Sequence, residues 1–240
     1  MTPSPFTHCP VLFEDNDLLF VDKPEGVLSH PNPGASKSSC AFEGKYSLEE
    51  RLFDTPQGRL WLIHRLDQDA SGVLLAAKNL KSAEACREAF EKGDVKKNYL
   101  ALVSRKPMPA RGQWRDALVE RHVGTGIRAS INPSKPPNAL LHYTLKEYFP
   151  RSNLSLLEIA LITGKTHQIR AQATYHGHSL AGDRLYGNFA LNKELRGSLG
   201  LRRLFLHAWQ LKIRHPSRNE SLDVQSPLPE TLERSLGKAH

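Results

Sequence analysis

The chain consists mainly of short apolar runs that turn residues separate, and this pattern constrains its fold more than any other feature. The runs at 11–13 and 18–22 flank a Glu-Asp-Asn-Asp segment, which predicts an antiparallel hairpin. The runs at 140–149 and 154–162 are joined by a Pro-Arg-Ser-Asn turn and predict a second hairpin. Because hairpins outnumber strand–helix–strand units, we expect a single α+β domain with a mixed, largely antiparallel sheet and flanking helices.

The other elements follow from spacing and from turn residues. Apolar residues at helical spacing over 80–90, followed by Gly93, predict a helix and its end. Further elements are expected as a turn at 23–26, a surface loop at 31–47, strands at 60–63, 73–77, 99–103 and 204–213, a helix at 166–176 that ends at Gly177, and a helix at 229–236.

The composition is that of a globular protein, with 39% hydrophobic and 24% charged residues in a chain of 240. No apolar run approaches the roughly 18 residues that a membrane span needs, and the N-terminus lacks the pattern of a secretory signal. The three cysteines are far apart and fit neither a disulfide framework nor a zinc site. We therefore expect a cytoplasmic protein without a membrane partner.

Positive charge is concentrated in two segments. The net charge is +8, yet residues 1–50 carry three Lys against eight acidic residues. Residues 96–128 hold eight Lys or Arg against two acidic residues, and residues 193–218 hold seven against one. The two basic segments could converge into one phosphate-binding face, or they could be two solvated surfaces with no ligand.

Five polar stretches carry residues suited to chemistry. They are HRLDQDASG at 64–72, KNYLALV at 97–103, TGKTHQIR at 163–170, GDRLYG at 182–187 and LHA at 206–208. Taken alone, Asp67 is typical of a turn and Tyr99 of a core strand. The GKT segment is not a phosphate loop, because position 159, where the first glycine of that motif belongs, is Ile159. A helix N-terminus beside Lys165 remains as an anion site.

In this order and with these gaps, the five stretches resemble the RluA family of RNA pseudouridine synthases. The opening EDNDLLFVDKPEGVLSHP is also similar to the first strand and KP-x-G turn of that family, and the resemblance covers about residues 11–230. It implies a pseudouridine-synthase-like catalytic domain over 1–240 with a central cleft. The implied activity is that of an isomerase that converts a specific uridine in ribosomal or transfer RNA to pseudouridine without a cofactor.

The resemblance also implies three catalytic residues. Asp67 matches the carboxylate that either attacks C1′ or acts as a base on the sugar, and both roles need it ionised. Arg170 matches a partner whose charge lowers the pKa of that carboxylate and whose planar fork orients it. Tyr99 matches an active-site tyrosine whose ring can stack on uracil and whose hydroxyl is a candidate for the proton step at C5.

Four more residues are implied as substrate contacts. The target base must leave its stack, and Arg65 matches a position that fills the vacated space. Lys97 and Lys165 are interpreted as phosphate or active-site charge contacts, and Leu206 as part of the apolar wall around uracil. The structural alternatives are that Arg65 pairs with a surface acid and that Leu206 is ordinary core.

The sequence departs from the family pattern in three places. Ala70 replaces a usual threonine, and Ala171 and Gln172 follow the GKTHQIR stretch where the family usually has Val-His. The chain is expected to be a short form without the N-terminal RNA-binding domain of many members. RNA affinity must then come from the catalytic domain, so we expect both basic segments to border the cleft that holds Asp67.

Two other classes of protein compete with this interpretation. One is an RNA-binding protein or chaperone that keeps the fold without catalysis, and the other is a metal-dependent nuclease. We expect no metal site, because the candidate ligands His167, His176 and His178 come without a spaced carboxylate or thiolate set. The expected partner is a structured stem-loop of ribosomal or transfer RNA, and no obligate protein partner is evident.

Overall fold

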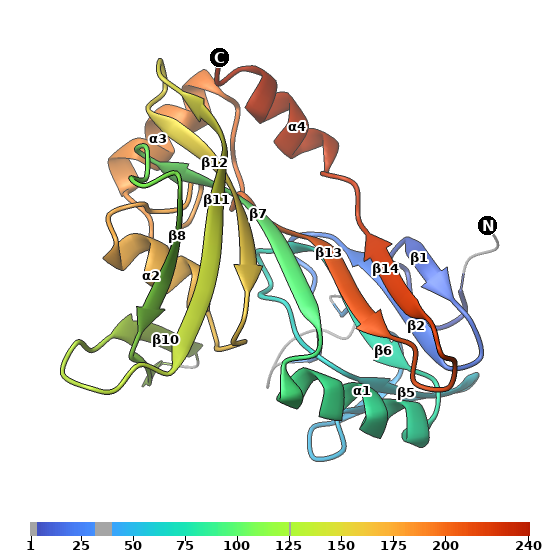
Figure 1. The fold of residues 1–240 in the computed structure, drawn as a ribbon. Coiled ribbons are helices and arrows are strands. Elements are labelled where there is room, and N and C mark those ends of the chain that lie inside the picture. The colour runs from blue at the N-terminus through green and yellow to red at the C-terminus, as the bar shows by residue number, and fades with distance from the viewer. Residues whose placement is uncertain (1–3, 32–39, 125) are drawn as a thin grey trace. The chain divides into compact units, whose positions relative to one another are not determined.

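A computed structural model describes residues 4–31, 40–124 and 126–240 of the chain (Figure 1). The chain divides into two compact units. The first comprises Met1–Lys96 and Ala208–Pro227, and the second comprises Lys97–His207 and Leu228–His240. None of the helices in the described part of the chain combines the length and apolar character that a membrane crossing requires. That the whole chain acts as a single catalytic domain stays a prediction.

The first unit is a sheet with one helix. Its elements are β1 (Val11–Glu14), β2 (Leu18–Lys23), β3 (Lys45–Ser47), β4 (Leu52–Thr55), β5 (Gly58–Leu62), β6 (Ser71–Ala77), α1 (Leu80–Lys92) and β14 (Ser221–Gln225). β13 (Leu206–Arg214) begins in the second unit with Leu206 and His207 and continues in the first from Ala208. The strands follow the order β3-β4-β5-β6-β13, with β2 on β6, β1 on β2 and β14 on β13.

Helix α1 covers the apolar face of this sheet. It packs on β5 and β6 (Figure 1), and its Ala83 and Cys86 share a buried core with Phe20 and Leu75. Asn79 caps the start of α1 by accepting the N–H of Ser82, and a left-handed Gly93 ends it, which are the usual terminal signals of a helix.

The second unit combines a sheet, a separate hairpin and three helices within its described residues. Its elements are β7 (Lys96–Ser104), β8 (Arg111–Asp116), β9 (Leu118–Val123), β10 (Gly126–Ile131), β11 (Ala139–Phe149), β12 (Leu154–Leu161), α2 (Gln168–Tyr175), α3 (Phe189–Ser198) and α4 (Glu230–Gly237). Lys96, the first residue of β7, belongs to the first unit. The strands follow the order β7-β12-β11-β8, and all three neighbouring pairs are antiparallel.

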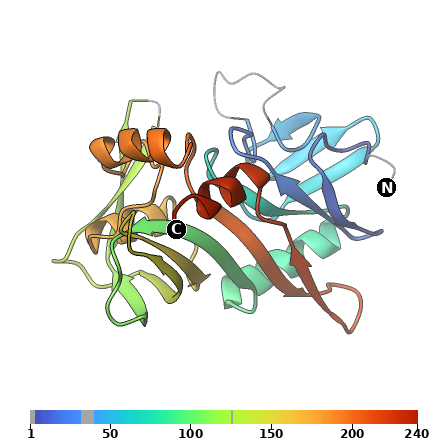
Figure 2. The same cartoon turned by 90° about the horizontal axis from the view of Figure 1, so that it is seen from above.

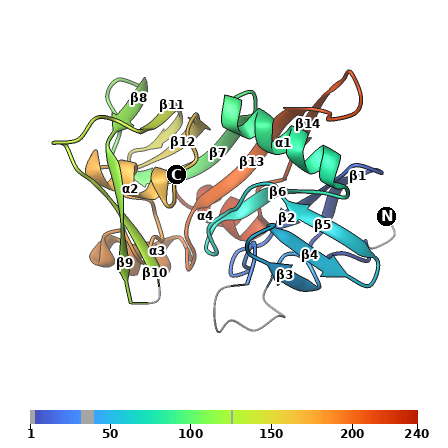
Figure 3. The same cartoon turned by 90° about the horizontal axis from the view of Figure 1, so that it is seen from below.

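Helices cover the second unit in two places. Leu195 of α3 and Leu232 of α4 pack in one core with Phe149 and Phe205, and Figure 2 shows both helices, orange and dark red. Figure 3 shows the hairpin of β9 and β10 beside α2, where Ala129 of the hairpin packs with Ala171 of the helix.

The α+β class with a largely antiparallel sheet is confirmed, and both expected hairpins form. The expected loop at 31–47 is wrong at its end, where Lys45–Ser47 pair with β4, while residues 32–39 lie outside the described residues. The helix expected from 166 begins at Gln168, because His167 has a left-handed backbone with φ 52°. The spacing gave no sign of α3 or of the hairpin of β9 and β10.

Candidate active site

Asp67 lies in the loop between β5 and β6 of the first unit, and its side chain is half-buried. Its carbonyl accepts the N–H of Ala70 at 3.1 Å and closes a turn. Upstream, His64 accepts the N–H of Leu75 through Nε2 at 3.2 Å and stacks on Phe90, with ring centroids 5.1 Å apart. His64 is therefore part of the frame of the loop, which agrees with a structural rather than a catalytic role.

The backbone on both sides of Asp67 is fixed by the turn that follows β2. The hydroxyl of Ser29 both donates to the carbonyl of Leu66 and accepts its N–H, each at 2.9 Å. The carbonyl of Gln68 accepts the N–H of Gly26 at 2.8 Å and the Nζ of Lys23 at 3.3 Å. The residues before and after Asp67 are thus tied to one short segment.

Lys23 is a fully buried cation in this arrangement. Its Nζ also donates to the carbonyls of Pro24 and Val27, each at 2.8 Å. An ammonium has three hydrogens, so these two carbonyls and that of Gln68 match its donors in number. Hydrogen bonds therefore connect the KP-x-G turn directly to the loop that carries Asp67.

Gly72 lets the loop enter β6 against β13. Its φ is +117°, and a Cβ at this position would lie 2.2 Å from the carbonyl oxygen of Ala208. Such a contact is impossible without moving the backbone of one strand, so the glycine at the end of the HRLDQDASG stretch is required for strand pairing.

Arg65 is exposed, and a histidine holds its guanidinium. Nη1 of Arg65 lies 3.0 Å from Nε2 of His30, while Nδ1 of His30 lies 3.1 Å from the carbonyl of Pro31. The carbonyl can only accept, so Nδ1 carries the proton and Nε2 accepts from Arg65. The ring of His30 stacks on Tyr46 at 5.1 Å. Burial, with the nearby charges of Arg65 and Arg51, lowers the pKa of His30 and favours this neutral form.

Tyr99 and Lys97 lie near the start of β7 in the second unit. Tyr99 is buried and pairs with Ile159 of β12. Nζ of Lys97 lies 3.4 Å from the carbonyl of Ile162, and burial lowers its pKa. A methyl group on Gly164 would lie 3.6 Å from the same Nζ. The structure thus brings Lys97 next to the turn that carries the exposed Lys165.

Arg170 projects from α2 and is almost fully buried in an ion pair. Its Nε lies 2.8 Å from one oxygen of Asp183, and its Nη2 lies 2.9 Å from the other. Burial on its own would raise the pKa of Asp183. The Arg170 guanidinium and the N–H groups of Tyr186 and Leu185 outweigh burial and lower it. Asp183 therefore fixes Arg170 through a bidentate, charge-assisted contact.

Tyr186 connects Arg170 to the hairpin of β9 and β10. Its hydroxyl accepts the N–H of Ala129 at 2.7 Å and lies 3.0 Å from Nδ1 of His167. The guanidinium carbons of Arg170 and Arg128 lie 5.2 and 5.6 Å from the centroid of its ring. The tyrosine thus contacts both an exposed arginine of the hairpin and the buried arginine of α2.

The departure after GKTHQIR is accommodated by hydrogen bonds. Gln172 is fully buried, and its Nε2 donates to the carbonyl of Trp114 at 3.1 Å and to Asp116 at 2.7 Å. Its Oε1 accepts from Gln168 at 3.0 Å. The amide that stands where the family usually has histidine is therefore satisfied, and α2 is anchored to β8.

One group of potential metal ligands occurs in the described part of the chain, formed by Asp15, Asp17 and His215 of the first unit. Nε2 of His215 lies 2.9 Å from Asp15, which also accepts from Arg218, and Asp17 accepts from Ser217. Because the Arg218 cation already pairs with Asp15, and Asp17 accepts hydrogen bonds from Ser217, Asn79 and Ser82, these residues fit an internal polar network better than a metal site.

The predicted residues are divided between the units. Asp67 and Arg65 belong to the first, and Lys97, Tyr99, Lys165, Arg170 and the buried Leu206 belong to the second. Four residues with positioning contacts received no role from the sequence: Lys23, Ser29, Asp183 and Tyr186. All four stand inside quoted stretches of sequence, so membership of a motif was the available signal, but the partner of each depends on tertiary packing.

Solved structures define the class of fold. "Human RNA Pseudouridylate Synthase Domain Containing 4" aligns with a TM-score of 0.73, covering 95% of this chain and 92% of that chain at 24% identity. "Human RNA Pseudouridylate Synthase Domain Containing 1" aligns with a TM-score of 0.71, covering 98% and 90% at 24% identity. The fold is therefore that of pseudouridine synthases.

Sequence comparison identifies the family. The family model described as RNA pseudouridylate synthase matches residues 17–175. "Ribosomal large subunit pseudouridine synthase C" of Vibrio parahaemolyticus is 34% identical over 94% of this chain and 68% of its own length. The protein of the same name from Escherichia coli K12 is 33% identical over 95% and 69%. The chain belongs to the RNA pseudouridine synthase family, a family of isomerases that act on RNA.

Proposed function

We propose that this enzyme converts a specific uridine in the RNA of the large ribosomal subunit to pseudouridine. The observation that carries the proposal is the similarity, over 94–95% of the chain, to proteins named for that substrate. The target is a uridine in a compact stem-loop, and the place of action is the cytoplasm. Transfer RNA is the other substrate class that the sequence favours.

Asp67 acts on the ribose of a uridine that has left its stack. As a nucleophile it attacks C1′, and as a base it removes a proton from the sugar; either step breaks the bond between N1 and C1′. Uracil then rotates and C5 bonds to C1′; at this step the bond from Asp67 to C1′ breaks, or Asp67 returns the proton that it took from the sugar. The proton lost from C5 is balanced by one gained at N1. Substrate and product are isomers, so the reaction requires no external oxidant or reductant.

Arg170 and Tyr99 complete the catalytic set in this proposal. Arg170 keeps Asp67 ionised and oriented, and the contact of Arg170 with Asp183 supports this role because it fixes one side of the guanidinium. Tyr99 stacks on uracil and exchanges the C5 proton. Its burial in β7 supports a fixed ring position.

The remaining residues hold the substrate. Arg65 enters the space that the flipped uridine leaves, supported by its exposure and by its anchor on His30. Lys97 and Lys165 contact phosphate or active-site charge, and Leu206 forms the apolar wall beside uracil. The whole chain acts as one catalytic domain to which both units contribute.

Pseudouridine mapping across total RNA tests the proposal. A strain that lacks the chain is complemented with wild type, with Asp67→Asn, or with Asp69→Asn, an exposed acid of the same loop. We expect one or more large-subunit positions to lose the modification on deletion and with Asp67→Asn, and to regain it with wild type and Asp69→Asn. Modification retained with Asp67→Asn contradicts the catalytic role, and loss confined to transfer RNA contradicts the substrate. No lost position would favour the RNA-binding alternative.

A further inference from the structure

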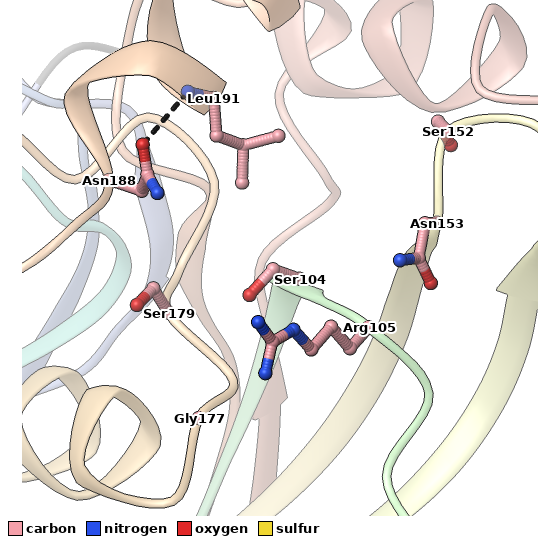
Figure 4. Close-up of a pocket in the computed structure, with 8 residues that line it drawn as sticks. All are labelled: Ser104, Arg105, Ser152, Asn153, Gly177, Ser179, Asn188 and Leu191. Atoms are coloured by element: carbon pink, nitrogen blue, oxygen red, sulfur yellow. Dashed lines mark hydrogen bonds between the residues drawn. The ribbon is translucent and has the colours of Figure 1, made fainter.

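A pocket of about 320 Å³ lies in the second unit, apart from the predicted catalytic residues of that unit. Four segments line it (Figure 4). They are the end of β7 with Ser104 and Arg105, the turn after β11 with Ser152 and Asn153, the segment after α2 with Gly177 and Ser179, and the start of α3 with Asn188 and Leu191. Tyr99 is five residues before Ser104 on β7, which is about 16 Å along an extended strand.

The lining is rich in hydrogen-bond donors and contains no acidic residue. The amide oxygen of Asn188 accepts the N–H of Leu191 at 3.1 Å, and that of Asn153 accepts the hydroxyl of Tyr148 at 3.2 Å. Both amides therefore turn their NH₂ groups the other way, and Figure 4 shows these nitrogens on the pocket side. With the guanidinium of Arg105 and the hydroxyl of Ser104, they form a setting for an anion.

Arg105 is held at this place at some cost to the fold. Its φ is 65°, in the left-handed region, which is unfavourable for a residue with a side chain. The carbonyl of Asn153 accepts its N–H at 2.7 Å and fixes it. The guanidinium extends toward Gly177, where a methyl group would lie 3.8 Å from Nη1. Among the described residues, no carboxylate pairs with this exposed cation.

The start of α3 adds to the positive character of the pocket. Asn188 caps this helix of ten residues, and the N–H groups of a first turn favour an anion in front of them. Phe189 follows Asn188 and is 85% exposed. Sites for single-stranded nucleic acid combine cations with exposed aromatic rings, so the surroundings fit a nucleotide better than a free inorganic anion.

We propose that this pocket is a second RNA-binding site, which takes the phosphate and ribose of a nucleotide distant from the target uridine. The guanidinium of Arg105 binds the phosphate. The NH₂ groups of Asn153 and Asn188 and the hydroxyls of Ser104 and Ser179 donate to phosphate oxygens or bond ribose hydroxyls, while Leu191 contacts the sugar. The volume is in the range of small-molecule sites and exceeds what one phosphate fills. The proposal requires only that the substrate is RNA and is independent of which RNA is modified.

Binding of a labelled RNA hexamer of mixed sequence to the full chain, measured by fluorescence anisotropy, tests the site. Arg105→Ala should raise Kd about tenfold, as expected for the loss of a charge-assisted hydrogen bond. Arg151→Ala is the matched control, because Arg151 is exposed in the adjacent turn without lining the pocket. It should change Kd less than twofold.

Asn188→Asp gives a second test that preserves the fold. Aspartate caps a helix as well as asparagine does, but it places a carboxylate where the NH₂ group faces the pocket. It should therefore weaken hexamer binding at least as much as Arg105→Ala. On a long RNA substrate, both variants should raise KM and leave kcat unchanged. Equal Kd changes for Arg105→Ala and Arg151→Ala, or wild-type binding by Asn188→Asp, would overturn the proposal.

Discussion

Asp67 in the first unit and Arg170 in the second are positioned by different means. Asp67 is half-buried, and its neighbours Leu66 and Gln68 are fixed through their backbone by Ser29, Gly26 and Lys23. Arg170 is buried, and its own side chain is fixed by the charge of Asp183. For Asp67, which we propose as the nucleophile or base, the contacts of Leu66 and Gln68 place the loop through its backbone. For Arg170, which we propose as the orienting cation, a contact to the guanidinium itself fixes the side chain.

We expect the charge-based arrangement, the contact of Arg170 with Asp183, to cost more free energy of unfolding when it is broken than the backbone-based arrangement around Asp67. Asp183→Ala leaves Arg170 buried without its partner, and breaking a buried pair costs about 3–5 kcal/mol. We expect a loss of this size in the free energy of unfolding from urea titration, together with loss of turnover. Asp183→Asn retains an acceptor without the charge, so its free energy of unfolding should lie between those of wild type and Asp183→Ala.

Glu88→Ala is the control for this loss. Glu88 and Lys92 form an exposed i,i+4 pair at 2.6 Å, and pairs of this kind often contribute nothing measurable. If Asp183→Ala unfolds at the same urea concentration as Glu88→Ala, then the contact of Asp183 with Arg170 is not a source of stability.

Breaking the backbone-based arrangement should have a somewhat smaller effect on stability and a specific effect on rate. Lys23→Met removes the donor for three carbonyls, and the buried groups left unpaired cost roughly 3 kcal/mol. We expect kcat to fall more than KM rises, because the loop that carries Asp67 moves while the proposed substrate contacts of the second unit, Lys97, Lys165 and Leu206, remain. Lys81→Met, at an exposed position of α1, is the control. A rise in KM with unchanged kcat would contradict the positioning role.

The sequence predicts the elements of both regions better than it predicts their connections. The β1–β2 hairpin and α1 were expected because their turns and caps are local signals. Helix α3 was not, because only Leu195 among its residues is fully buried and its apolar spacing is weak. The ion pair of Arg170 with Asp183 spans 13 positions and depends on how the GDRLYG turn packs against α2. Motif spacing contains no information on that contact.

Tyr186 links Arg170 to the exposed hairpin of β9 and β10, so a change at Tyr186 tests whether the contacts that fix Arg170 extend to the surface. Tyr186→Phe removes the hydroxyl that bonds Ala129 and lies beside His167 but keeps the ring between Arg128 and Arg170. We expect a loss of about 1 kcal/mol in stability and a decrease of a few fold in kcat. Tyr175→Phe, at an exposed tyrosine of α2, is the control. A wild-type kcat for Tyr186→Phe would show that the hydroxyl of Tyr186 does not help to position Arg170, and would limit the charge-based arrangement to the contact of Arg170 with Asp183.

The smallest expected effect concerns Arg65, whose anchor in the first unit depends on the neutral form of His30. Because the folded state lowers the pKa of His30, the unfolded chain binds more protons around and below its ordinary value of 6.5. The free energy of unfolding should therefore fall as the pH falls through 6.5, and the contribution should be fully present above it. His30→Phe keeps a ring to stack on Tyr46 but cannot titrate. Between pH 7.5 and 5.5, a range of about two units around the ordinary pKa of histidine, its urea midpoint should therefore decline less than that of wild type. His122→Phe, at an exposed position of the β9–β10 hairpin, should keep the wild-type decline. An identical decline in wild type and His30→Phe would show that the anchor of Arg65 does not depend on the protonation of His30.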